Sequence, residues 1–299
     1  MLNPEKSLND RWSDRLARST VLAKLGEAWQ PVILRVRDAG GPAAKYVLNG
    51  TFLGHALHPI LTDIPIGAWS AVALLDTIEV VGGADVALAS DATLGFGLLG
   101  GVAAIVTGWA DWADTKDDPR TVGMAHAILN GIAFSGYTVS LFLRRGGRRR
   151  AGIGLAYLSY AVSGLAAYLG GELMAGYQLG TKHTAEPLAP PDDFTRVAAL
   201  DAIEDGAMSA AEVNGIALLL FRRSDAVFAI AGACTHRGAP LREGTREGRA
   251  CVRCPWHGSV FSLEDGTVVE GPASFPQARF ETRVVNGFVE VRAPRSNQR

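Results

Sequence analysis

Residues 234–238 of this chain read Cys-Thr-His-Arg-Gly, and residues 254–258 read Cys-Pro-Trp-His-Gly. Each stretch offers one thiol and one imidazole, and each ends in a glycine that allows a tight loop. Two such loops can bind a dinuclear iron–sulfur cluster, because thiolates suit one iron and neutral imidazoles suit the other. Imidazole adds no negative charge, and this raises the reduction potential of such a centre. The two stretches therefore predict a redox centre near the C-terminus.

The same residue types leave two other chemistries open. Two cysteines and two histidines also suit a single zinc ion in a Cys2His2 site. Cys251-Val-Arg-Cys254 has the C-x-x-C spacing of a thiol redox pair. If Cys254 binds iron instead, Cys251 is left over as a small apolar strand residue.

The paired motif, Cys-x-His followed by Cys-x2-His, resembles that of the Rieske [2Fe–2S] domains, over about residues 193–293. The resemblance implies a [2Fe–2S] cluster as cofactor. It also implies that Cys234 and Cys254 ligate one iron, and that His236 and His257 ligate the other.

The subtype follows from four neighbouring positions. Rieske proteins of quinol–cytochrome complexes carry an extra cysteine in each loop, and Ala239 and Trp256 stand at those positions here. The chain therefore resembles the ferredoxin and oxygenase type, which works in reducing cytoplasm. High-potential members direct a serine and a tyrosine hydroxyl at the cluster; Ser259 is present beside the ligands, but Phe261 replaces the tyrosine. We expect a potential in the lower half of the family range of about −150 to +300 mV.

The sequence around the motif favours β-structure. Ile216–Phe221 and Ala226–Ala231 are short apolar runs, and Asn214-Gly215 and Asn286-Gly287 are hairpin turn signals. A polar, proline-rich stretch over residues 182–193 reads as a linker. We expect a small antiparallel β domain over residues 194–295.

Long apolar runs fill the first half of the chain. Ala92–Ala110, Thr121–Leu143 and Ala151–Gly171 contain no charged residue, and His58–Val81 carries charges only near its ends. Each run is long enough to cross the ~30 Å hydrocarbon layer of a membrane. The alternative, buried helices of a soluble core, is disfavoured because the short connecting loops leave only lipid to cover the runs. The fold class expected is α+β, with a four-helix transmembrane bundle over residues 51–181 and the small antiparallel β domain after it.

The membrane half also resembles a known family. The run His58–Gly67, the pair Asp111-Trp112, His126 and Gly170-Gly171 are similar to an uncharacterised four-helix membrane domain, over about residues 50–182. Members of that family sometimes occur fused to Rieske domains. The resemblance implies a membrane location and no assured activity.

Residues 1–50 show a different pattern and no apolar core of a cleavable signal peptide. From Trp12 to Val36, apolar residues recur at helical spacing with basic residues between them. This favours a basic amphipathic helix on a membrane surface, with an ordinary soluble helix as the alternative.

A weak internal repeat relates the membrane helices. His58–Ile64 and His126–Ile132 are identical at four of seven positions, and Gly95–Leu98 resembles Gly152–Leu155. Two parallel repeats would be related by an axis along the membrane normal, with His58 and His126 at similar depth. Three interpretations of these histidines stay open: a haem b or other metal site, a quinone or proton-handling site, and interfacial residues that cap helices.

The predicted function is that of a membrane-anchored Rieske protein that passes single electrons. The alternatives are the ferredoxin component of an oxygenase system and a membrane redox sensor. A terminal oxygenase iron needs two histidines and a carboxylate, and the four histidines outside the motif all lie in or beside the membrane helices. No self-contained oxygenase site is therefore expected, and whether the chain is an enzyme stays undecided.

The expected partners are a lipid bilayer and a redox partner protein or quinone. The formal charge of −1 gives no basic footprint for nucleic acid. Glycine-rich helices pack readily, so a homo-oligomer is compatible with the sequence. We expect a multi-pass protein of the cell membrane. The overall count of lysines and arginines on the two sides of the spans favours a cytoplasmic β domain, whereas the charges close to the spans are nearly even.

Overall fold

The computed structural model describes residues 8–183 and 190–293. Clustering of contacts divides the chain into two compact units. The first unit contains residues 8–39 and 57–179. The second unit contains residues 40–56, 180–183 and 190–293. Residues 40–56 thus belong to the same unit as the β domain. The bounds expected from the sequence placed residues 51–56 with the four-helix bundle.

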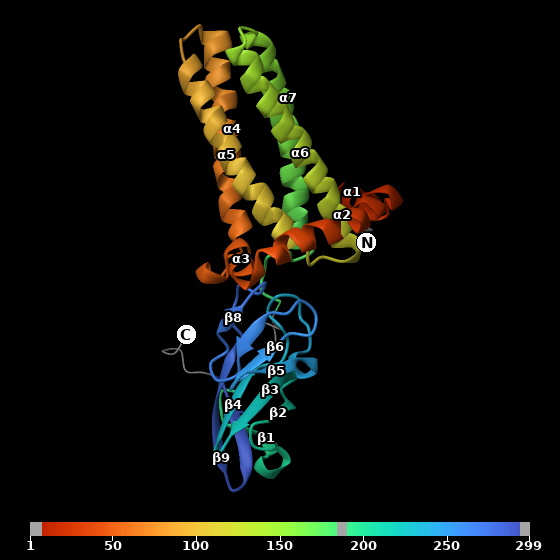
Figure 1. Ribbon diagram of the computed structural model, residues 1–299, viewed down its shortest axis with the longest axis vertical. Helices are drawn as coiled ribbons and strands as arrows, with labels where there is room; N and C mark the ends of the chain where they lie inside the picture. The colour runs from red at the N-terminus through yellow and green to blue at the C-terminus, as the bar shows by residue number, and fades with distance from the viewer. Residues whose placement is uncertain (1–7, 184–189, 294–299) are drawn as a thin grey trace, which may run out of the picture. The chain divides into compact units, whose positions relative to one another are not determined.

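The first unit is entirely helical (Figure 1). Its helices are α1 (Leu8–Ala17), α2 (Thr20–Ala39), α4 (Leu57–Gly82), α5 (Ala87–Trp112), α6 (Asp117–Arg145) and α7 (Arg149–Gly171), and α7 continues into a π-helical turn, η2 (Glu172–Gly176). Helices α4 to α7 are each long and apolar enough to cross a membrane. This confirms the four apolar helices expected from the sequence.

The four long helices form two hairpins, α4 with α5 and α6 with α7 (Figure 1). A glycine with positive φ lies in each hairpin turn: Gly83 at 65° and Gly147 at 78°. Only glycine adopts this backbone conformation without steric cost, so the turns are encoded locally.

The hairpins meet through a buried aromatic pair. Trp69 of α4 stacks on Tyr137 of α6 with ring centroids 4.3 Å apart. Small residues on the partner helices make room for the rings: a Cβ atom at Gly97 would lie 2.5 Å from Trp69 Nε1. Close helix packing through small residues is typical of membrane bundles.

A buried ion pair joins the same two helices near the hairpin turns. Arg144 of α6 donates to both carboxylate oxygens of Asp76 of α4, with Arg144 Nη1 to Asp76 Oδ1 at 2.8 Å. Ser90 Oγ of α5 donates to Asp76 Oδ1 at 2.6 Å. Asp76, Arg144 and Ser90 are all buried. Asp76, one of the charges that interrupt the first apolar run, therefore has a partner inside the bundle.

The amphipathic pattern of the N-terminal region corresponds to two helices, where one was expected. The helix breaks at Arg18 and Ser19, between α1 and α2. Ser19 Oγ accepts a hydrogen bond from Leu22 N at 3.4 Å, as a residue that starts a helix does. Trp29 of α2 is 51% exposed, so apolar surface remains on this helix in the isolated chain.

The second unit is a two-sheet antiparallel β domain with a short helical segment. Strands β1, β10, β9, β4, β3 and β2 form the larger sheet in that order, and β5 to β8 form the smaller one. The bounds are α3 (Gly41–Leu48), η1 (Thr51–Leu53), β1 (Thr195–Ala199), β2 (Met208–Val213), β3 (Ile216–Arg223), β4 (Ala226–Ala231), η4 (Leu241–Glu243), β5 (Thr245–Glu247), β6 (Cys251–Arg253), β7 (Val260–Ser262), β8 (Val268–Glu270), β9 (Arg279–Val285) and β10 (Phe288–Arg292).

The two Asn-Gly pairs, which predicted hairpin turns, lie in turns between adjacent antiparallel strands. Asn214 and Gly215 have φ values of 50° and 79° between β2 and β3, and Asn286 and Gly287 have 52° and 78° between β9 and β10. Two consecutive positive φ values are the mark of a type I′ hairpin turn. The antiparallel β domain predicted from the sequence is confirmed.

Candidate metal centre

Two loops of the second unit share one backbone design. Loop 1 (residues 234–238) follows β4, and loop 2 (residues 254–258) connects β6 to β7. In loop 1, Gly238 N donates to the carbonyl of the cysteine at 2.7 Å, and in loop 2, Gly258 N does so at 3.2 Å. The two glycines have φ values of 72° and 77°. The glycine at the end of each stretch is therefore required by the turn itself.

A second hydrogen bond closes each loop. Cys234 N donates to Ala239 O, and Cys254 N donates to Ser259 O, both at 2.8 Å. Each cysteine thus has its backbone N–H and C=O fixed by residues four and five positions later. The loops are pre-formed by backbone hydrogen bonds, which orient both cysteines.

The side chains of the two loops converge as two like pairs. Cys234 and Cys254 are buried, and their thiols share a hydrogen bond. The rings of His236 and His257 lie with centroids 5.0 Å apart, at 86° to each other. Nδ1 of each ring is buried. Four side chains from two loops therefore meet as a sulfur pair and a nitrogen pair.

The electrostatics around the sulfurs favour negative charge on Cys254. The hydrogen bond with Cys234, together with the N–H groups of Trp256 and His257, lowers the pKa of Cys254 to about 6 against the opposing effect of burial. The same shared hydrogen bond raises the pKa of Cys234, whose sulfur also accepts from two backbone N–H groups of its own loop. Backbone donors aimed at a sulfur stabilise a thiolate or a negatively charged cluster.

The donor set fits a dinuclear cluster. Two thiols on one side and two imidazoles on the other supply two ligands to each of two irons.

A third segment, residues 271–277, supports both loops. Ser259 Oγ accepts a hydrogen bond from Ala273 N at 2.9 Å, and Thr235 Oγ1 donates to Phe275 O at 2.6 Å. The amide of Gln277 donates to Ala233 O at 3.0 Å and accepts from Thr235 N of loop 1 at 2.9 Å. Ser259, expected beside the ligands, is therefore buried and joins loop 2 to this segment.

Residues 40–56, which precede the first membrane helix, also contact the segment 271–277 that supports the two loops. Thr51 Oγ1 donates to Ala273 O at 2.9 Å, and both groups are buried. A Cβ atom at Gly271 would lie 2.9 Å from Thr51 Oγ1, so the two backbones approach closely. Sequence reasoning missed Thr51, because 222 residues separate it from Ala273 and no local pattern marks the contact.

Arg253 holds the base of loop 2. Its guanidinium donates to Gly258 O at 2.7 Å and pairs with Glu247 at 2.5 Å and Glu270 at 3.0 Å. The hydrogen bonds with the two carboxylates raise the pKa of Arg253. A lone arginine next to a cysteine in the sequence gives no signal for this role.

The other singled-out positions lie outside the sulfur and nitrogen pairs. Cys251 is a half-buried residue of β6. Ala239 is 1% exposed, Trp256 is 53% exposed and Phe261 is fully buried. The two positions without cysteine therefore offer no disulfide, and Phe261 packs in the core between the sheets.

The histidines of the membrane unit occupy equivalent positions in the two hairpins. His58 Nδ1 lies 2.9 Å from Ala104 O of α5, and His126 Nδ1 lies 2.8 Å from Ala166 O of α7. Each histidine of the first helix of a hairpin thus contacts a backbone carbonyl of the second.

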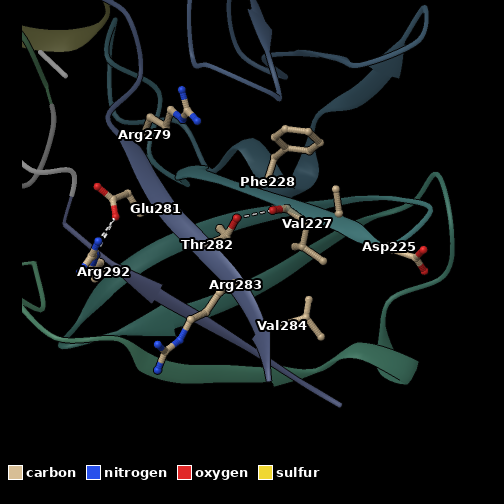
Figure 2. Close-up of a pocket in the computed structure, with 10 residues that line it drawn as sticks. Asp225, Val227, Phe228, Arg279, Glu281, Thr282, Arg283, Val284 and Arg292 are labelled. Atoms are coloured by element: carbon tan, nitrogen blue, oxygen red, sulfur yellow. Dashed lines mark hydrogen bonds and ion pairs between the residues drawn. The ribbon is translucent and has the colours of Figure 1, made fainter. Parts of the chain in front are cut away.

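A surface depression of about 750 Å³ lies elsewhere on the second unit. Figure 2 shows it where β4 and β9 diverge, with Thr282 Oγ1 donating to Val227 O and Arg292 paired with Glu281. Its lining is charged and contains none of the loop cysteines or histidines. It is therefore separate from the metal centre.

Comparison with protein families identifies both halves of the chain. Residues 193–281 match the Rieske [2Fe-2S] domain, and residues 54–183 match a predicted membrane protein family (DUF2231). The second match fits the four apolar helices of the first unit.

Individual relatives cover the C-terminal part. Ferredoxin CarAc of Metapseudomonas resinovorans is 35% identical over 79 residues, which are 26% of this chain and 73% of the relative. The anthranilate 1,2-dioxygenase ferredoxin subunit of Burkholderia cepacia is 33% identical over 105 residues, 35% of this chain and 88% of the relative. Mouse apoptosis-inducing factor 3 is 30% identical over 112 residues, 37% of this chain, but the match spans only 18% of that protein.

Among solved structures, the ferredoxin of carbazole 1,9a-dioxygenase from Nocardioides aromaticivorans IC177 is similar, with 27% identity and a TM-score of 0.33. The similarity covers 34% of this chain and all of that ferredoxin. With two ferredoxins matched over most of their length and the paired loops in place, the chain belongs to the Rieske [2Fe–2S] family, and its Rieske domain follows a membrane domain of the DUF2231 family.

Proposed function

We propose that this protein is a membrane-anchored one-electron carrier whose [2Fe–2S] cluster is held by loops 1 and 2. Cys234 and Cys254 would bind one iron, and His236 and His257 the other. The observation that carries the proposal is the convergence of the two loops, with the thiols hydrogen bonded and the imidazole rings 5.0 Å apart. The cluster supplies a centre that gains and loses a single electron.

The burial of the four side chains indicates from which side a redox partner would approach the cluster. Both cysteines are buried, whereas His236 and His257 are only partly buried and neighbour the exposed residues Pro255 and Trp256. The imidazole side would therefore face a redox partner, while the thiolate side stays shielded from water. The backbone N–H groups aimed at the sulfurs would stabilise the additional negative charge of the reduced state.

The reduction potential would lie low within the family range. Hydrogen bonds to the sulfurs stabilise the reduced state and raise the potential. Phe261 has no hydroxyl to donate, which leaves the O–H of Ser259, whose Oγ accepts from Ala273 N, as the one donor of this pair of positions. Without a loop disulfide at Ala239 and Trp256, the site also suits a reducing compartment.

The four long helices would keep this carrier at the membrane, with the Rieske unit in the cytoplasm. The arginine-rich turn between α6 and α7 opposes that orientation in a simple charge count. Two of its arginines are engaged in the fold, since Arg144 pairs with Asp76 and Arg149 pairs with Glu79 and Asp91. These partners give the arginines of this turn a role in the structure of the bundle.

A ferredoxin component of an oxygenase system is the second candidate. Its support is that two relatives are named as ferredoxins, one of them a dioxygenase subunit, and are matched over 73% and 88% of their length. In that case the partner would be a separate oxygenase, and the electron would leave through the same imidazole side.

The test is metal analysis with electron paramagnetic resonance of the full chain purified in detergent. We expect two non-haem irons and two sulfides per chain, and the rhombic signal of a reduced Rieske centre. A protein that carries stoichiometric zinc and no such signal would overturn the proposal. Adding the purified chain to an oxygenase that lacks its ferredoxin separates the two candidates, because only the second predicts turnover.

A further inference from the structure

Equivalent residues of α4 and α6, the first helices of the two hairpins, are separated by a constant number of positions in the sequence. In α4 and α6, the buried partners Asp76 and Arg144 are 68 residues apart, and the stacked rings of Trp69 and Tyr137 have the same separation. Two pairs of equivalent residues therefore touch each other across the bundle. Direct contact between equivalents is what a local two-fold axis between α4 and α6 produces.

His58 and His126 are a third pair in this register. They are separated by the same 68 residues, and they are close enough to interact electrostatically. Both occur near the start of the apolar part of their helix, on the end away from the hairpin turns. The axis that joins the other two pairs therefore passes between the two imidazoles.

The second helix of each hairpin holds its histidine in the same way. The contacts to Ala104 O and Ala166 O measure 2.9 and 2.8 Å. Four residues further along those helices, a Cβ atom at Gly108 would lie 2.8 Å from His58 Cε1, and one at Gly170 would lie 3.1 Å from His126 Cε1. Each ring lies against the backbone of a glycine. Its orientation is therefore fixed both by this contact and by the hydrogen bond to the carbonyl.

These contacts determine which ring nitrogen is free to bind a ligand. A carbonyl can only accept, so Nδ1 of each ring carries the proton, and Nε2 keeps its lone pair. In α6, Asn130 Nδ2 lies 3.1 Å from His126 Nε2 and donates to it, which agrees with this tautomer; a metal bound at Nε2 would replace this hydrogen bond. Donation of the second ring nitrogen to a backbone carbonyl is the usual arrangement for an imidazole that ligates a metal.

We propose that His58 and His126 are the two axial ligands of a b-type haem bound on the axis between α4 and α6. The choice of ligand rests on the number of protein donors. Among the described residues no third His, Cys, Asp or Glu joins the two imidazoles, whereas a bare zinc or copper ion needs three or four protein ligands. A porphyrin supplies four ligands to its iron and leaves two axial positions to the protein. Helical bundles bind such cofactors between facing helices.

The experiment uses the full chain in detergent, stripped of tetrapyrrole and titrated with hemin. We expect saturable binding of one haem per chain, with the low-spin spectrum of bis-imidazole coordination. His58→Ala and His126→Ala should each abolish that spectrum, and added imidazole should restore it. His55→Ala is the matched control, because His55 is exposed and its Nδ1 lies 3.2 Å from the carbonyl of its neighbour Ala56.

Three outcomes would overturn the inference: no saturable haem binding, low-spin haem retained in both alanine variants, or a bound quinone that the same variants lose while no haem binds. The Rieske signal is read from the same samples. If it is absent while the haem behaves as expected, the proposed electron carrier fails and this inference stands.

Discussion

Each unit of this protein positions a pair of histidines by using one structural device twice. In the Rieske unit the device is a loop of five residues, closed by hydrogen bonds from its own backbone. In the membrane unit it is a helical hairpin, in which the histidine of one helix meets a carbonyl 40 or 46 residues away on the other. The loop therefore carries its geometry within a short stretch of sequence, whereas the hairpin distributes it along two helices.

This difference decides how each site responds to change. A loop closed on itself should lose its cofactor when a single ligand is removed, while the surrounding sheets stay folded. A hairpin pair that depends on contacts across the bundle should instead lose stability when an inter-helix contact is removed. Four substitutions test this contrast, from the largest expected effect to the smallest.

Replacing a loop cysteine should abolish the cluster. Cys254→Ser removes one of two thiolates in the sulfur pair, and we expect complete loss of the Rieske signal and of bound iron. Cys251→Ser is the matched control, because this thiol lies on β6 outside the pair and should keep a full cluster. Loss of iron in the Cys251 variant alone would contradict the ligand assignment.

Breaking the buried ion pair should destabilise the membrane unit. Asp76→Asn removes the buried charged partner of Arg144 and leaves it only the longer pair with Asp91 at 3.3 Å, and loss of a buried partner costs up to about 3–5 kcal/mol. Thermal unfolding in detergent measures the effect, while the Rieske signal should be unchanged. The double variant Asp76→Leu with Arg144→Leu should recover most of the loss. A single variant as stable as the parent would show that the pair does not join the hairpins.

Removing the hydroxyl of Thr51 should weaken the Rieske unit. Thr51→Val leaves the buried Ala273 carbonyl without this donor, at a cost of about 1–3 kcal/mol. We expect the visible signal of the cluster to be lost at a lower temperature. Thr51→Ser keeps the hydroxyl and should behave as the parent does. Equal melting of both variants would mean that the segment before α4 does not support the cluster loops.

Adding a hydroxyl at Phe261 should raise the reduction potential. Phe261→Tyr introduces a donor at the position where high-potential relatives are expected to have one, and a hydrogen bond to the cluster would favour the reduced state by about 1 kcal/mol. Redox titration of the full chain measures the change. Phe228→Tyr is the control, because Phe228 lines the surface depression on β4 (Figure 2). A potential that shifts equally in both variants would rule out a specific hydrogen bond.

The sequence predicts those features whose cause is local. The cluster loops are readable because cysteine, histidine and glycine lie within five residues of each other. The Asn-Gly turns are readable because positive φ needs those residue types. The membrane helices are recognisable from composition, but α5 begins at Ala87 and not at Ala92, because Asp91 is paired with arginines of the other hairpin and is tolerated there.

The remaining features depend on contacts that a single sequence does not reveal. The sequence match between His58–Ile64 and His126–Ile132 pairs residues that are also structurally equivalent in α4 and α6. The match between Gly95–Leu98 and Gly152–Leu155 pairs residues of α5 and α7 that are not structurally equivalent. The carbonyls of Ala104 and Ala166 place α5 and α7 in a register five residues away from that match. A backbone carbonyl has no residue type, so the sequence alone offers no mark for this contact.

The buried acid and base also explain why the two hairpins need each other. Across the axis, Asp76 occupies the position that Arg144 occupies in the other hairpin. If two copies of the same hairpin associated in this way, two carboxylates or two guanidinium groups would face each other in a dry interior, which is strongly unfavourable. The two hairpins are therefore not interchangeable, and the bundle requires one hairpin with the acid and one with the base.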